Sequence, residues 1–347
     1  MQVDFKKATL NEFLEHKTLY YDKIDFTIVE SSWKILSTKI NLPFVIHIVG
    51  TNGKGSTGRF LAHYLYKKEF KVLHYSSPHI MKFNERIWIN GNDVSDENLE
   101  LAHIFLQDLF PLELLSKLTY FEYTTLLAFY LSKDFDYLVL EAGLGGEFDA
   151  TNVVENNLSL ITTIGLDHMS FLGNTVEEIA ATKMRSADNK MLIGYQVFNS
   201  VLKTAYKVKE QILKERNKNI EIIEVKEFDK YELNNKFASY LKRNLHLVIE
   251  CLHELKIPID LKLFNDVPLF GRCQKILPNV TIDVGHNPLA AHVIAKEFEG
   301  KKITLNELIE NKLVQEIKNN GKTCDVKKSY VKLTKTNDAY LLKTSLT

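Results

Sequence analysis

Apolar residues follow two different spacings along this chain, and the two spacings alternate. Short runs rich in β-branched residues predict buried strands, whereas longer stretches with apolar residues three and four positions apart predict helices. The runs that predict strands are Phe44–Val49, Val72–Tyr75, Glu85–Asn90, Asp136–Glu141, Leu158–Ile164 and Ile220–Val225. Strands that alternate with helices are typical of an α/β fold, with a mainly parallel sheet flanked by helices.

The predicted helices differ in how much of their surface is apolar. Residues 1–40 are expected to be mostly helical, and residues 196–219 are expected to form an exposed helix, because charges of both signs are interleaved along it. A helix over Lys236–Leu255 has an apolar stripe with Asn244 at its polar edge. Thr175 and Glu178 have the spacing of a capping box and so predict the start of another helix.

The segment from Phe44 to Thr57 combines a buried strand, a glycine-rich turn and the start of a helix. Its turn, Gly50–Ser56, reads Gly-Thr-Asn-Gly-Lys-Gly-Ser. Glycines let the backbone approach an anion closely, and the free N–H groups of a helix N-terminus point at it. The common nucleotide loop has a hydroxyl residue directly after its lysine, whereas here Gly55 follows Lys54. An ordinary turn is the alternative, but three glycines around one lysine favour a phosphate site.

Bulk composition excludes several classes of function. The 347 residues suggest about two domains. Lys plus Arg and Asp plus Glu both number 44, so no net field attracts nucleic acid or acidic lipid. The cysteines Cys251, Cys273 and Cys324 are far apart, which fits a reducing compartment. Neither a signal peptide nor an apolar run of membrane-spanning length is found, so we expect a cytoplasmic protein. We also expect a monomer.

Three polar residues follow the ends of predicted strands. Ser77 follows the strand 72–75, Glu141 ends the strand 136–141, and His168 follows the strand 158–164. Open α/β sheets bind ligands at this edge, and Mg²⁺ prefers oxygen ligands. Taken singly, each has a plainer interpretation: a capping serine, an exposed turn glutamate, a structural histidine. Glycine density after Glu141, in Gly143–Gly146, favours the close approach of a ligand there.

Four motifs in order resemble one protein family. Besides Gly50–Ser56, these are Ser76–His79 with Asn84–Ile87, Glu141–Asn152 and Gly165–His168. They are similar to the folate branch of the Mur ligase superfamily, the dihydrofolate synthase/folylpolyglutamate synthase family. The resemblance covers about residues 20–300 and implies an ATPase domain with a phosphate loop, followed by a second, smaller α/β domain.

The resemblance also implies roles for individual residues. The nucleotide contacts it implies are Asn52, Gly53, Lys54, Gly55, Ser56, Thr57, Asn244, Arg272, Asp283 and His286. The implied metal ligands for Mg²⁺ are Ser77, Glu141 and His168. The implied pterin and substrate contacts are Thr119, Tyr120, Phe121, Phe148, Asp149 and Ala150. The implied catalytic residues are Lys54, Lys183 and His168, with Lys183 carried as a carbamate, which requires a neutral amine.

The chain departs from the family pattern at several of these places. Glu147 stands where the family often has arginine, and Thr182–Arg185 replaces Glu-Lys-Ala-Gly around Lys183. Of a His-Gln-x-x-Asn pattern only Asn244 remains. Near the N-terminus, the segment Lys23–Ile28 lacks the glycine and arginine that the family often has at its pterin-contacting turn.

The resemblance predicts the domain organisation and the reaction. Residues 1–268 are expected to bind ATP and pterin, with a linker at 258–268, and residues 269–347 to form a Rossmann-like domain that is either reduced or clipped. The implied reaction joins L-glutamate to dihydropteroate or a reduced folate through an acyl phosphate. Two alternatives stay open: a cell-wall Mur ligase, against which the stretch Thr119–Glu122 argues, and a non-catalytic ATP-binding paralogue, which the short second domain favours.

Overall fold

The computed structural model divides the chain into two compact units. The first comprises Met1–Asn234 and Leu241–Pro268, and the second Asn235–Tyr240 and Leu269–Thr347. The residues that the structure describes are 5–18, 25–226, 233, 237–277, 280–285, 287–299, 303–307, 326–335 and 340–345. Each unit is described by itself below.

The first unit is built on an eight-stranded sheet in the order β4-β3-β2-β5-β1-β6-β7-β8. The strands are β1 (Phe44–Val49), β2 (Val72–Tyr75), β3 (Ile87–Ile89), β4 (Asn92–Asp93), β5 (Tyr137–Glu141), β6 (Leu158–Ile161), β7 (Lys190–Ile193) and β8 (Glu221–Glu224). The six strands β2, β5, β1, β6, β7 and β8, in this order, pair in parallel. At one edge, β3 pairs antiparallel with β2 and with β4. The predicted mainly parallel α/β sheet is therefore confirmed.

Four neighbouring strands carry the predicted phosphate and metal motifs. In the order β2-β5-β1-β6 all three pairings are parallel, with Ile48 of β1 opposite Glu141 of β5 and Leu160 of β6. The carboxyl ends of parallel strands meet at one edge of a sheet, where open α/β folds bind their ligands. The motifs that follow these strands therefore share one edge.

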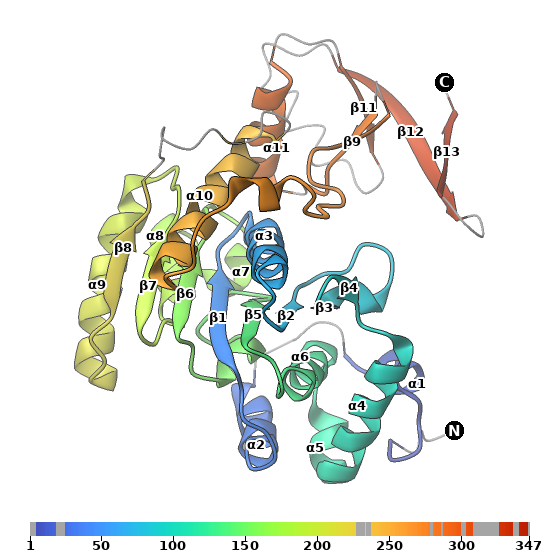
Figure 1. Cartoon of the computed structure of the whole chain (residues 1–347), viewed down its shortest axis with the longest axis vertical. Helices are drawn as coiled ribbons and strands as arrows, with labels where there is room; N and C mark the ends of the chain where they lie inside the picture. Colours follow the sequence, from blue (N-terminus) through green and yellow to red (C-terminus); the bar gives the residue numbers. More distant parts are fainter. Residues whose placement is uncertain are drawn as a thin grey trace. The chain divides into compact units, whose positions relative to one another are not determined.

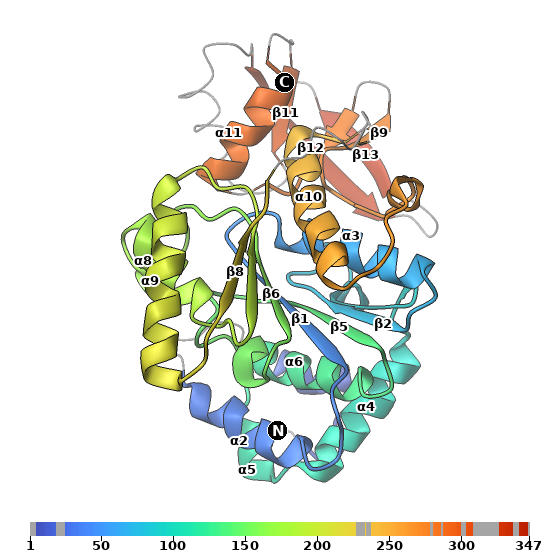
Figure 2. The same ribbon diagram turned by 60° about the vertical axis from the view of Figure 1, so that its left-hand side comes forward.

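Helices cover both faces of this sheet (Figures 1 and 2). The main ones are α1 (Leu10–Glu15), α2 (Phe26–Leu36), α3 (Lys54–Lys67), α4 (Asp96–Leu109), α5 (Leu112–Lys117), α6 (Tyr120–Leu131), α7 (Met169–Leu172), α8 (Val176–Met184), α9 (Asn199–Arg216) and α10 (Ser239–Glu254). Figure 2 shows α8 and α9 on one side of the sheet and α3 and α10 on the other. One core joins α1, α2, α4 and α6 to β2 and β5, and another joins α8 and α9 to β6 and β7.

The described part of the second unit is smaller. It contains an antiparallel pair, β9 (Gln274–Leu277) with β10 (Val280–Ile282), and the helix α11 (Pro288–Glu297). A three-stranded sheet joins β11 (Ile303–Glu307), β12 (Val326–Lys335) and β13 (Tyr340–Ser345), with β12 parallel to β11 and antiparallel to β13. Asp283 directly follows β10, and α11 begins five residues after it. The Rossmann-like assignment of residues 269–347 remains a prediction.

Three predictions of local structure were wrong. Residues 85–90 are not one strand, because Phe83–Arg86 forms a 3₁₀ helix in which the Glu85 carboxylate accepts backbone N–H bonds from residues 80–82. The helical pattern around His103 suggested a surface or half-buried side chain, but His103 is fully buried, and its ring nitrogens bond the Tyr123 hydroxyl and the Ala8 carbonyl. Helix 199–216 buries one stripe, including Val208, against the sheet, so it is exposed on only one face.

Residues 258–268 are also not a loose linker. They contain a short 3₁₀ helix, Leu261–Phe264, whose Phe264 side chain is 1% exposed and stacks on Tyr64 of α3 with ring centroids 4.7 Å apart. The Tyr64 hydroxyl donates to the Pro258 carbonyl and accepts from the Asp260 N–H, both at 2.7 Å. This segment is therefore fixed to the first unit.

We expect Tyr64→Phe to lower the free energy of unfolding by about 1–3 kcal/mol, because it leaves a carbonyl and an N–H group without their shared partner. Urea unfolding would measure the change. Tyr66→Phe on the same helix is the matched control, because that side chain is 37% exposed. Equal stabilities of the two variants would show that the Tyr64 hydroxyl does not hold the segment.

Candidate active site at the carboxyl edge of the sheet

The glycine-rich turn after β1 has the backbone that a phosphate cradle needs. Gly50 and Gly53 have φ angles of +152° and +95°, which side chains other than glycine rarely adopt. The N–H groups of Thr51 and Asn52 both donate to the Thr163 carbonyl, at 3.0 and 3.1 Å, so the turn is tied to the end of β6. Lys54 is the first residue of α3. Its ammonium donates to the carbonyls of Gly50 and Thr51, at 3.2 and 3.4 Å, and so folds back over the turn.

Crowding around the turn explains its glycines. A Cβ on Gly50 would lie 1.9 Å from Thr162 Oγ1, and one on Gly53 would lie 2.7 Å from Asn244 Oδ1. Gly55, Ser56 and Thr57 follow in the first turn of α3, and the last two are buried. In the part of the chain that the structure describes, Thr57 Oγ1 is buried without a hydrogen-bond partner. A buried hydroxyl at a helix N-terminus fits a bound anion.

Asn244 lies against this turn from α10. Its side chain is 7% exposed, and its Nδ2 has no hydrogen-bond partner among the described residues. The side chain is therefore buried, and not at a polar edge as the sequence suggested. A buried donor without a partner costs free energy unless a ligand or water accepts its hydrogen bond.

Asn244→Leu is therefore expected to leave stability unchanged or raise it, while weakening binding of an ATP analogue about tenfold. Isothermal calorimetry and thermal unfolding would measure the two effects. If stability falls and affinity is kept, Asn244 is a structural residue and not a nucleotide contact.

Two of the three predicted metal ligands meet. Glu141 ends β5, and its side chain is 5% exposed. The Ser77 N–H, just beyond β2, donates to Glu141 Oε2 at 3.3 Å. A buried carboxylate beside a hydroxyl residue, at the edge that carries the phosphate turn, fits Mg²⁺, which takes oxygen ligands and keeps several waters.

His168 lies beyond the end of β6, on the other side of β1. It has a left-handed backbone with φ of +47° and is the residue before the first turn of α7. Its side chain is 55% exposed, with Nε2 3.8 Å from Asp167 Oδ1. Within the described residues no group of three His, Cys, Asp or Glu side chains gathers as a metal site. A divalent ion here would need Ser77, water or a nucleotide phosphate to complete its ligands.

Lys183 is buried in α8 and lies within electrostatic range of the phosphate turn. Its side chain is 4% exposed, and burial lowers the pKa of its amine to about 7. The charge of Lys54 contributes to this lowering of the pKa, whereas the carboxylates of Asp167 and Asp149 oppose it. A large part of the amine is therefore neutral near pH 7, as addition to CO₂ requires.

The predicted acceptor residues come from two segments that touch. Thr119 and Glu122 form a capping box at the start of α6, with Thr119 Oγ1 donating to the Glu122 carboxylate at 2.8 Å. The Phe121 ring lies against Gly143, where a Cβ would be 2.6 Å away, and 5.8 Å from the ring of Tyr75. Tyr120 lies under the guanidinium of Arg86, at 5.3 Å.

The glycine-rich loop after β5 supplies the other predicted acceptor residues. Asp149 is 4% exposed and accepts from the Leu144 N–H at 2.7 Å and from the Thr151 hydroxyl at 2.6 Å. Burial raises its pKa. Ala150 is buried, whereas Phe148 is 55% exposed, with its ring edge-on to Phe26 at 6.4 Å. Asp149 therefore shapes the loop, and Phe148 presents an open aromatic face.

The second unit carries the remaining nucleotide predictions. Both oxygens of Asp283 accept internal hydrogen bonds: Oδ2 from the Tyr240 hydroxyl and the Cys273 N–H, and Oδ1 from the Gly285 N–H. Asp283 thus holds its own turn together. Arg272 is half-buried, and its nucleotide role stays a prediction. His286 lies outside the described residues.

Sequence reasoning gave no role to Arg86. Its side chain is 9% exposed, and its Nε donates to His79 Nδ1 at 2.8 Å beside Tyr120. A cationic residue directly before a buried strand, in the Asn-Glu-Arg-Ile motif, was the signal available.

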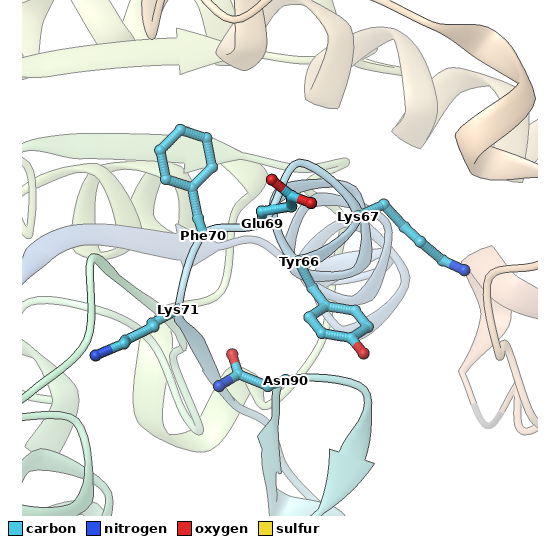
Figure 3. A pocket seen from close by; sticks show the side chains of 6 residues that line it. All are labelled: Tyr66, Lys67, Glu69, Phe70, Lys71 and Asn90. Atoms are coloured by element: carbon cyan, nitrogen blue, oxygen red, sulfur yellow. The ribbon is translucent and has the colours of Figure 1, made fainter.

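A hollow of about 480 Å³ lies far from these residues. Its lining consists of Tyr66, Lys67, Glu69, Phe70, Lys71 and Asn90. Figure 3 shows them around the end of α3 and the start of β2. The phosphate turn is at the other end of this 14-residue helix, about 20 Å away. This hollow is therefore not part of the candidate site. Among the described residues, no helix is long and apolar enough to cross a membrane.

Comparison with known proteins identifies the family. The Mur ligase middle domain family matches residues 48–266. The dihydrofolate synthase/folylpolyglutamate synthase of Haemophilus influenzae is 32% identical over 327 residues, which cover 80% of this chain and 73% of that protein. The chain belongs to the dihydrofolate synthase/folylpolyglutamate synthase family.

Solved structures of folylpolyglutamate synthases share the fold. The Helicobacter pylori folylpolyglutamate synthetase is 33% identical, with a TM-score of 0.68 over 96% of this chain and 86% of that one. A bifunctional folylpolyglutamate synthase/dihydrofolate synthase, solved with Mn, AMPPNP and L-glutamate bound, is 22% identical, with a TM-score of 0.76 over 97% and 86%. The similarity to the second shows the fold alone.

Proposed function

We propose that this chain is an ATP-dependent amide ligase that adds L-glutamate to dihydropteroate, to the glutamate tail of reduced folates, or to both. Family membership supports the reaction class. The observation that carries the proposal is the common edge of β2, β5, β1 and β6, which carries the phosphate turn and Glu141. Lys183 of α8 lies within electrostatic range of Lys54 in this turn. A site with these groups suits phosphoryl transfer.

The reaction has two steps in this proposal. A carboxylate oxygen of the acceptor attacks the γ-phosphorus of ATP, and ADP leaves. The neutral amine of L-glutamate then attacks the acyl carbon, and the amide forms as phosphate leaves with the former carboxylate oxygen and takes up the proton that the amine loses. Lys54 stabilises the negative charge that develops on the transferring phosphoryl group.

Divalent-metal chemistry also belongs to the proposal. Ser77, Glu141 and His168 would hold Mg²⁺, which would neutralise phosphate charge when bound. The buried carboxylate of Glu141 supports this role. One relative of the same fold was solved with Mn and AMPPNP.

We further propose that Lys183 reacts with CO₂ and carries a carbamate. Its burial and its pKa of about 7 support a neutral amine, the form that adds to CO₂. A mass increase at Lys183 that is lost in acid would support the adduct. A bare amine in a crystal supplied with CO₂ would contradict it.

The test of function measures phosphate release from ATP with a panel of acceptors. We expect release to require L-glutamate together with dihydropteroate, tetrahydrofolate or both, and mass spectrometry to find a product one glutamyl residue heavier. Release only with a cell-wall precursor would indicate a cell-wall Mur ligase. ATP binding without release for any acceptor would indicate a non-catalytic paralogue.

A further inference from the structure

The glycine-rich loop after β5 is fastened to the last turn of α8. The Glu147 N–H donates to the Thr182 carbonyl at 3.0 Å. A Cβ on Gly146 would lie 2.6 Å from the Lys183 carbonyl oxygen and 3.0 Å from its Cα. The loop backbone therefore rests directly on the backbone of Lys183, with no room for a side chain between them.

One ion pair joins the same two segments. Arg185 Nε donates to Glu147 Oε2 at 2.6 Å, and Arg185 Nη2 donates to Thr182 Oγ1 at 3.3 Å. The Arg185 and Glu147 side chains are 28% and 27% exposed, so water screens the pair only in part. A short, charge-assisted hydrogen bond of this kind also fixes geometry.

This pair accounts for two unusual residues in the sequence. Glu147 stands where its motif in the family often has arginine, and Arg185 stands where the separate motif around Lys183 usually has glycine. The charges are opposite, and the structure brings them into contact. The two departures from the family pattern therefore carry opposite charges that contact each other.

The loop that the pair holds also carries the proposed acceptor contacts. The Asp149 N–H donates to the Gly146 carbonyl at 3.2 Å, and the Asp149 carboxylate accepts from the Leu144 N–H. Residues 143–149 are thus one hydrogen-bonded turn, with Phe148 at its exposed face. Moving Glu147 would shift this turn relative to Lys183.

We propose that Glu147 and Arg185 are a positioning pair, which fixes the position of the acceptor loop 143–150 relative to Lys183. Neither residue touches reacting atoms in this proposal, which rests on the proposed ligase function. The pair sets the orientation of the acceptor, while Lys54 and the phosphate turn bind the nucleotide independently. Loss of the pair should therefore affect the acceptor more than ATP.

A charge-reversal cycle tests the proposal. The variants are Glu147→Arg, Arg185→Glu and the double reversal. We expect each single variant to lower kcat/KM for the acceptor about tenfold or more, with KM for ATP changed less than about twofold. In the double variant, kcat/KM for the acceptor should recover to within about threefold of wild type. Hydrogen exchange of the peptide over residues 143–149 should be faster in each single variant and slow again in the double variant.

A matched control separates positioning from stability. Lys190 pairs with Glu254 through side chains that are 27% and 24% exposed, at the amino-terminal start of β7 and so away from the site. Glu254→Arg breaks a pair of similar burial. We expect it to lower the melting temperature without changing kcat/KM for the acceptor.

Three results would overturn the proposal: additive losses in the double variant, an equal rise in KM for ATP, or the same activity loss in the Glu254 control. Wild-type protein that is inactive with every acceptor would instead refute the proposed function. In that case hydrogen exchange alone tests whether the pair holds the loop. Recovery of slow exchange in the double variant would support the positioning pair, and failure to recover would contradict it.

Discussion

Methionine in place of Lys54 is expected to lower the rate of ATP-dependent amide formation about 100- to 1000-fold. The lysine ammonium lies over the phosphate turn and, among the residues that the structure describes, donates long hydrogen bonds to the Gly50 and Thr51 carbonyls. Removing it should cost little stability, because hydrogen bonds of 3.2 and 3.4 Å are long and weak. In the reaction, however, the ammonium would stabilise charge that exists fully only in the transition state. Steady-state kinetics should therefore show the loss mainly in kcat.

The control is Lys67→Met at the last residue of the same helix. Lys67 pairs with Asp266 on the surface, at 2.9 Å and with side chains 36% and 60% exposed, so its removal should change neither activity nor stability much. An unchanged kcat in Lys54→Met, or an equal loss in Lys67→Met, would remove the phosphate turn from the mechanism.

Lys183→Met is expected to abolish ligase activity and yet stabilise the protein at pH 7. Burial lowers the pKa of the amine to about 7 in the folded state, against its ordinary value of 10.5. Between these values the unfolded chain binds a proton that the folded chain does not, so wild-type stability should rise as pH increases from about 7 to about 10. Below pH 7 the buried amine is charged in the folded state, and this lowers the free energy of unfolding by about 3–5 kcal/mol.

Methionine fills a similar volume without a charge and so removes this penalty. Denaturant unfolding in buffers free of bicarbonate should show a more stable variant at pH 7, and its stability should depend less on pH between 7 and 10 than that of wild type. A variant that is less stable at pH 7, or one with the wild-type pH dependence, would contradict the buried neutral amine. Retained activity would exclude Lys183 from the reaction.

The sequence predicted the features that depend on local pattern. The apolar run Phe44–Val49 and the glycines after it determine a strand and a turn by their own conformational preferences, and both are present. The common edge of β2, β5, β1 and β6 agrees with the expectation that an open α/β sheet binds its ligand where its strands end. The buried environment of Lys183 agrees with the neutral amine that the family resemblance required.

Features that depend on tertiary contacts were not predictable in this way. The burial of His103 follows from partners on a distant segment and a distant helix, Ala8 and Tyr123. The apparent linker at 258–268 is ordered by Tyr64, almost 200 residues earlier. The pairing of Glu147 with Arg185 joins a loop to a helix, and the sequence shows only two separate departures from a motif.

The most direct test of the account is the fate of the acceptor's carboxylate oxygen. An acceptor labelled with ¹⁸O in the reacting carboxylate should pass one labelled oxygen to the phosphate released with each amide bond formed. That result is required if the carboxyl edge of the sheet makes an acyl phosphate. Amide formation with unlabelled phosphate would contradict the account.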